Sequence, residues 1–118
     1  YLLLLTTTYY CLLLLTTTYY CLLLLNAGVP NAGPTSNALA VLSAHLEGQL
    51  DRIQRIVRLG VFVASDSGFH DQPKVANGAS ELMQDVFGDA GRHARAAVGS
   101  IALPLGATVE VELIAHVD

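Results

Sequence analysis

Residues 93–115 have the sequence HARAAVGSIALPLGATVEVELIA, and this stretch says most about how the chain folds. It predicts two short apolar strands joined by a turn at residues 103–106. Arg95 lies among alanine and valine residues in the first strand, and Glu110 lies between two valines in the second. A charge in an apolar strand is costly to bury without a partner, so both residues are candidates for a functional site.

The two strands are predicted to pair as a hairpin. With a symmetric turn, Arg95 lies opposite Ile114. Glu110 then lies opposite Gly99, and because opposed residues share a face, Arg95 and Glu110 are expected on one side of the sheet. They are about four residues apart, or about 13 Å at ~3.3 Å per residue, which suits a small anion held between guanidinium and carboxylate. Alternatively, each charge is paired elsewhere or exposed at a sheet edge. The opposite face is expected to be the core face, with Ala96, Val98, Val109, Val111, Leu113 and Val117.

The pattern A-R-x-A-V-G, then L-P, then V-E-V-E-x-I-A resembles the C-terminal signature of the RidA (YjgF) family, in a RidA-like subgroup. The resemblance continues back through residues 73–82 and 50–63, and it covers about residues 37–118. It implies an α+β fold of the chorismate-mutase type, a mixed sheet with two helices packed on one face. It also implies a homotrimer with sites between subunits, in which the charge-poor face of Ala97, Gly99 and Ile114 is covered.

The resemblance also implies a function. The family is associated with hydrolysis of reactive enamines and imines, such as 2-aminoacrylate, to keto acids and ammonia. Arg95 matches the arginine that binds the substrate carboxylate, and Asn77 matches an asparagine that lines the pocket. Glu110 matches the glutamate that handles water and proton transfer. Ala97 differs from members that carry a cysteine at this position, so no thiol contributes here.

Composition limits the choice of partner. The chain has 118 residues and a net charge of −4, and Lys74 is its single lysine. It lacks a basic stripe, which disfavours nucleic acid as a partner. Charged residues make up 14% of the chain and none precedes Glu47, as expected when neighbouring subunits cover part of the surface. We expect one domain over residues 1–118, in a cytoplasmic protein.

The first 25 residues are anomalous. The decamer LLLLTTTYYC occurs twice over residues 2–21, between Tyr1 and the run Leu22–Leu25. It is long and apolar enough to suggest a membrane span, yet it lacks the basic region and cleavage site of a signal peptide. Three interpretations are open: the residue types are placeholders or artificial, the segment is designed, or it is a natural hydrophobic segment. If the residue types are placeholders, Cys11 and Cys21 carry no redox information. We expect one or two strands here and no membrane helix.

The remaining elements follow from periodicity and end signals. A loop is predicted over residues 26–36, followed by a helix capped by Ser36. A strand is predicted over residues 53–64, and a second helix with Asp71 as a possible cap, Pro73 in its first turn and Gly88 at its end. The expected core residues of the first helix are Leu39, Leu42, Leu46 and Leu50, of the strand Ile53, Val57, Leu59, Val61 and Val63, and of the second helix Val75, Ala79, Leu82, Met83, Val86 and Phe87.

Other chemistry has little support in the sequence. The four histidines, His45, His70, His93 and His116, have no metal-ligand spacing, and we expect no metal and no organic cofactor. His93 lies two residues before Arg95, as a pocket residue or a surface or interface one. The serines, Ser80 among them, lack a nucleophile motif. Three functions remain: an imine or enamine deaminase, a non-catalytic carboxylate-binding or regulatory protein, and an endoribonuclease, which the acidic charge disfavours.

Overall fold

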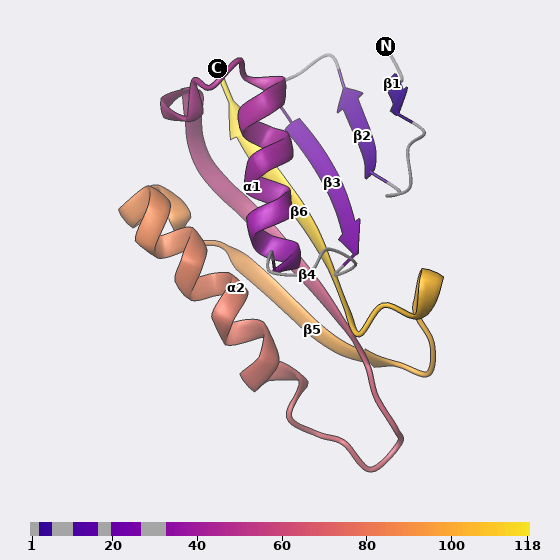
Figure 1. Ribbon diagram of the computed structural model, residues 1–118. Helices are drawn as coiled ribbons and strands as arrows, with labels where there is room; N and C mark the ends of the chain where they lie inside the picture. Colours follow the sequence, from indigo (N-terminus) through magenta and orange to yellow (C-terminus); the bar gives the residue numbers. More distant parts are fainter. Residues whose placement is uncertain (1–2, 6–10, 17–19, 27–32) are drawn as a thin grey trace.

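The computed structural model describes residues 3–5, 11–16, 20–26 and 33–118, with side chains from residue 33 onward. It confirms the predicted α+β fold, a mixed sheet and two helices that share one core (Figure 1). The strand order is β1-β2-β3-β6-β4-β5, and among the strand pairs of the described residues only β4 and β5 are parallel. The elements are β1 (Leu3–Leu5), β2 (Cys11–Thr16), β3 (Tyr20–Asn26), α1 (Pro34–His45), β4 (Ile53–Ala64), α2 (Gln72–Phe87), β5 (Ala94–Ser100) and β6 (Val109–Val117).

The described parts of the N-terminal segment are strands. β3 pairs with β6 over its whole length, from Tyr20 opposite His116 to Asn26 opposite Glu110. Strands were expected here, but the segment contributes three of them to the sheet where one or two were predicted. Among the described residues, no helix is long and apolar enough to cross a membrane.

Helix α1 begins two residues before its predicted cap. Gly33 occupies the N-cap position and Pro34 the first turn, where its missing N–H costs nothing, so Ser36 lies inside the helix and the predicted cap is wrong. The predicted loop is correspondingly shorter at both ends, because Asn26 closes β3, while residues 27–32 lie outside the described part. The core side of α1 holds Ala38 and Leu42, both fully buried.

Helix α2 has the predicted limits. It follows Asp71, includes Pro73 and ends at Gly88, whose φ of 58° lies in the left-handed region. Asp71 makes no side-chain cap, and its carboxylate lies 2.9 Å from the Lys74 ammonium. The buried residues are Ala76, Ala79 and Met83, whereas Val75 and Val86, predicted in the core, are exposed.

Strand β4 lies between β6 and β5 in the sheet and has its predicted limits. Its register with β6 shifts between Ile53 and Arg55 and again between Ile56 and Arg58. Each shift resets the alternation of faces, so Ile56 is fully buried and Val57, predicted in the core, is only half-buried. Beyond the second shift, Leu59, Val61 and Val63 alternate as predicted and face the helices.

The predicted hairpin of β5 and β6 is wrong, because β4 lies between these two strands. β5 follows α2 as a crossover and runs parallel to β4, and residues 101–108 then cross the end of β4 to reach β6. Leu59 pairs with Arg95 on one side and with Leu113 on the other. Phe62 pairs in the same way with Val98 and Glu110.

This register puts Arg95 and Glu110 on opposite faces of the sheet. Paired residues share a face, so Arg95 lies with buried Leu59 on the helix side, and Glu110 lies with Phe62 on the other side. The predicted core residues of β6 are confirmed at Val111 and Leu113.

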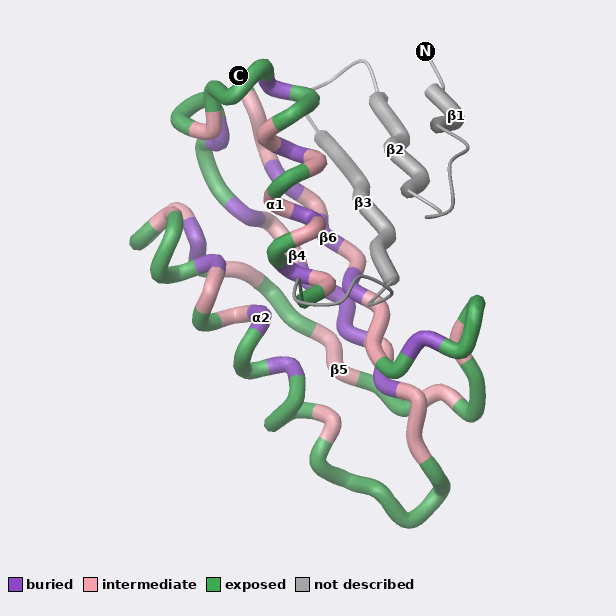
Figure 2. Tube along the Cα trace, viewed as in Figure 1, coloured by how far each residue is buried: buried purple, intermediate pink, exposed green. Residues whose placement is uncertain are grey.

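The prediction for β5 is reversed. Ala97 packs on the core and Gly99 lies beside the start of α2, whereas Ala96 and Val98 face away from the helices. Ala97 and Gly99 therefore do not share a face with Ile114, as the predicted covered face required. Figure 2 shows β5 as the outer strand, largely exposed or half-buried.

Candidate functional site

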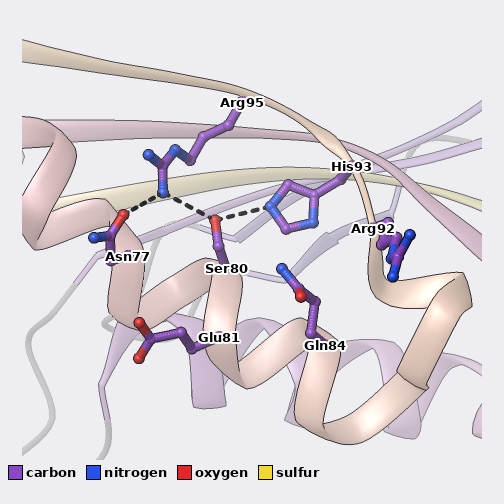
Figure 3. A pocket seen from close by; sticks show the side chains of 7 residues that line it. All are labelled: Asn77, Ser80, Glu81, Gln84, Arg92, His93 and Arg95. Atoms are coloured by element: carbon purple, nitrogen blue, oxygen red, sulfur yellow. Dashed lines mark hydrogen bonds between the residues drawn. The ribbon is translucent and has the colours of Figure 1, made fainter.

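A polar pocket of about 560 Å³ lies where α2 passes over the start of β5 (Figure 3). On α2, the lining positions 77, 80, 81 and 84 are three, four and seven residues apart, which places them on one face of the helix. On the strand side, Arg95 and His93 are two residues apart and point to the same side. The pocket is lined by Asn77, Ser80, Glu81, Gln84, Arg92, His93 and Arg95.

Arg95 is held by α2 through one nitrogen only. Its Nη1 donates to Asn77 Oδ1 at 2.9 Å and to Ser80 Oγ at 3.2 Å (Figure 3). The Nε and Nη2 groups of Arg95 make no hydrogen bond to another described residue. An arginine has five N–H donors in a rigid fork, so donors remain for an anion while the side chain is kept in place.

Ser80 connects Arg95 to His93. Ser80 Oγ lies 2.9 Å from His93 Nε2, and His93 Nδ1 lies 2.5 Å from the carbonyl oxygen of Gly91. A carbonyl only accepts, so Nδ1 carries the hydrogen, and in this tautomer Nε2 accepts from the Ser80 hydroxyl. The result is one directed chain in which Arg95 donates to Ser80, Ser80 to His93, and His93 to Gly91.

Gly91 makes this arrangement possible. It is buried in the short turn that follows α2, and a Cβ at this position would overlap the backbone carbonyl of Met83. Only glycine therefore lets the turn pack closely enough on α2 for its carbonyl to meet His93.

Glu110 lies away from this pocket. Arg95 and Glu110 are three positions apart in register and two strands apart in the sheet, about 10 Å in each direction, and they point to opposite faces. Burial raises the pKa of Glu110, and the charge of Glu112 raises it further. Glu112 itself is bound by Arg58, with Nη1 and Oε1 3.0 Å apart, a contact that the sequence did not suggest.

The structure thus joins two of the three predicted site residues. Arg95 donates a hydrogen bond to Asn77, and Glu110 does not meet them within one chain. His93 lines the pocket, one of the two alternatives left open for it, and Ser80 is a further member that was not assigned to the site. The available signal was their spacing, since Ser80 lies one turn after Asn77, and His93 lies two residues before Arg95. In the part of the chain with described side chains, no three His, Cys, Asp or Glu residues gather as metal ligands.

Comparisons with known proteins agree with the fold. Residues 27–117 match the family described as "YjgF/chorismate mutase-like, putative endoribonuclease". A solved protein of unknown function from Agrobacterium tumefaciens is 33% identical with a TM-score of 0.77, covering 90% of this chain and 80% of that one. A "putative endoribonuclease" from Shewanella oneidensis MR-1 is 24% identical with a TM-score of 0.76, covering 89% and 83%, and shares the fold.

A curated relative matches over a shorter stretch. Protein TCP17 of Trypanosoma cruzi is 53% identical over 72 residues, which are 60% of this chain and 45% of that protein. The match thus spans less than half of the relative's length.

Proposed function

Because this chain belongs to the YjgF/chorismate mutase-like family, we propose that it is a cytoplasmic enzyme that hydrolyses reactive imines and enamines of 2-keto acids. The products are the keto acid and ammonia. The observation that carries the proposal is the Arg95 guanidinium, which is fixed by Asn77 and Ser80 in a polar pocket and keeps donors for a carboxylate. No cofactor is needed, since the carbon of a protonated imine is already electrophilic.

Arg95 positions the substrate. A 2-imino acid has its carboxylate next to the carbon that water must attack. A bidentate pair between that carboxylate and the guanidinium fixes both the distance and the plane of the reacting group. Asn77 contributes by holding the arginine, because its Oδ1 accepts from Nη1 and leaves the rest of the fork to the ligand.

We assign Glu110 to proton transfer in a site shared by subunits of a homotrimer. Within one chain it lies on the far face of the sheet from Arg95, so the glutamate that meets this arginine has to come from a neighbouring subunit. Two features support assembly: β5 is an edge strand, and Val98 on it and Ile101 just after it are 45% and 100% exposed. The raised pKa of Glu110 suits a carboxyl that passes protons between water and the leaving nitrogen.

A trapping assay tests the proposal. L-amino acid oxidase generates imines in situ, and semicarbazide captures those that survive. The wild-type protein is expected to suppress the semicarbazone signal, whereas Arg95→Ala should not, because binding is lost. Glu110→Gln should lower the rate on the order of 10²-fold through loss of proton transfer. His70→Gln, a change at an exposed histidine outside the pocket, serves as the control.

Two other outcomes are informative. If the wild type leaves the signal unchanged for several imines but binds 2-oxobutyrate through Arg95, the chain is a non-catalytic carboxylate-binding protein. Cleavage of RNA would instead support the activity named in the family description. The net charge of −4 and the single lysine argue against a polyanionic substrate.

A further inference from the structure

We propose that Ser80 and His93 form the base of this pocket, with Ser80 taking the proton of the attacking water and passing its own proton to His93 Nε2. The inference rests on the proposed hydrolysis and names the residues for its first proton transfer. Glu110 then serves the second proton transfer, in which a proton moves to the leaving nitrogen.

The direction of the hydrogen bonds carries the argument. His93 Nδ1 is committed to the Gly91 carbonyl at 2.5 Å, which leaves Nε2 as an acceptor facing Ser80 at 2.9 Å. This is the arrangement of a base that is oriented by a second acceptor and acts on a hydroxyl. Ser80 alone would be a poor base, and the imidazole nitrogen supplies the proton acceptor that the hydroxyl lacks.

The position of Ser80 relative to Arg95 places this chain of hydrogen bonds beside the group that would bind the substrate carboxylate. Ser80 Oγ lies 3.2 Å from Arg95 Nη1, the nitrogen next to those left free for the carboxylate. The carbon attacked by water is bonded directly to that carboxylate, so a substrate held by Arg95 occupies the pocket that the Ser80 hydroxyl also lines. Both Ser80 and His93 are partly buried, which limits exchange of the proton with bulk water.

The steps balance without any further reactant. The water oxygen bonds to the imine carbon while one water proton moves to Ser80 Oγ and the Ser80 proton moves to His93 Nε2. The resulting carbinolamine receives a proton on nitrogen from Glu110 of the neighbouring subunit, and the C–N bond breaks to release ammonia. The hydroxyl proton of the intermediate passes to the Glu110 carboxylate as the C=O bond forms. His93 passes its proton back through Ser80 to the released ammonia, so a protonated imine and water give the keto acid and ammonium.

The alternative role of Ser80 and His93 is purely structural, because they also hold Arg95. The two roles differ in what they change. Loss of positioning weakens ligand binding and raises KM, whereas loss of the relay lowers kcat and alters its pH dependence. The charged groups that line the pocket with His93 are Glu81, Arg92 and Arg95, and Arg92 faces Asp89 at 3.4 Å; all four stay constant in the variants below.

The experiment compares His93→Gln, Ser80→Ala and Ser80→Thr with wild type and with His70→Gln. Imine hydrolysis is followed from about pH 6 to 8, the range in which histidines exchange their proton. Binding of 2-oxobutyrate is measured by calorimetry.

His93→Gln and Ser80→Ala should lower kcat on the order of 10²-fold, and His93→Gln should change the pH dependence of kcat. Ser80→Thr retains the hydroxyl and should recover most of the rate. The affinity of His93→Gln for 2-oxobutyrate should stay within about threefold of wild type, a change of less than about one kcal/mol.

The outcomes separate the relay from the function on which it rests. If wild type is active and both His93→Gln and Ser80→Ala keep its kcat and pH profile, the relay is wrong and the hydrolase stands. A rise in KM alone would likewise assign Ser80 and His93 to positioning and overturn the relay. If wild type hydrolyses no imine, the proposed function itself fails.

Discussion

The two faces of the sheet hold their charged residues in different ways. On the helix face, α2 and β5 supply complementary groups, and Arg95, Ser80 and His93 satisfy one another in a directed chain. On the opposite face, Glu110 and Glu112 are neighbours on β6 and repel each other, and Arg58 binds only Glu112. The comparison shows that a fixed polar cluster forms where α2 crosses β5. Two carboxylates that are neighbours on β6, in contrast, leave Glu110 with a raised pKa.

Substitution at Gly91 should have the largest effect on stability, and it alters only the helix face of the sheet. In Gly91→Ala, the added Cβ overlaps the Met83 carbonyl, so the turn must move away from α2. We expect a loss of about 3 kcal/mol in the free energy of unfolding, measured by urea denaturation. The displaced carbonyl also releases His93, so imine hydrolysis should fall even where the variant is folded.

The matched control is Gly78→Ala, because a Cβ at Gly78 of α2 meets no atom within 4 Å. It should stabilise the helix slightly, by up to about 1 kcal/mol. Equal stability of the two alanine variants would show that the turn and α2 are not packed as closely as described.

Arg58 tests the opposite face with an intermediate effect. Arg58→Met removes the partner of Glu112, whose side chain is only 18% exposed, and should cost about 1 kcal/mol of stability. The uncompensated charge of Glu112 should also raise the pKa of Glu110 further, which NMR titration of the side-chain carboxyl carbon measures. Arg55→Met is the control, since Arg55 is exposed on the same strand and has no ion pair among the described side chains. An unchanged Glu110 titration in Arg58→Met would contradict the coupling between these three residues.

The same comparison explains what the sequence predicts well. The limits of β4 and α2 follow from local signals, because alternating apolar residues, Pro73 and Gly88 act within a few residues of themselves. Arg95 and Asn77 were predicted as site residues through the resemblance to a family. Such a resemblance assigns roles to positions in the sequence and does not depend on the order of the strands. Both kinds of prediction are independent of which strands are neighbours.

The failed predictions depend on strand order and helix crossing. The hairpin assumed that consecutive strands are neighbours, whereas the parallel β4–β5 pair inserts β4 between β5 and β6 and reverses the face of Arg95 relative to Glu110. The bulges in β4 place Ile56 in the core, where Val57 was predicted. The contact of Ser80 with His93 requires α2 to cross β5 at one particular height, and the spacing of residues in each element does not contain that information.

Glu112→Gln should have the smallest effect and isolates the electrostatic part of the Glu110 environment. The introduced amide would keep an oxygen for Arg58 but no charge, so the pKa of Glu110 should fall toward its ordinary value while burial still holds it above that value. A carboxyl with a raised pKa in the folded chain binds more protons than in the unfolded chain, so stability falls as pH rises from the ordinary to the raised value. In Glu112→Gln this fall should be smaller, with a shift of at most a few degrees in Tm across that window. Thermal unfolding between about pH 4 and 7 measures it, with the exposed Glu47→Gln as control. An unchanged pH dependence in Glu112→Gln would mean that burial alone raises the pKa of Glu110, and the two carboxyls on the open face would then be independent.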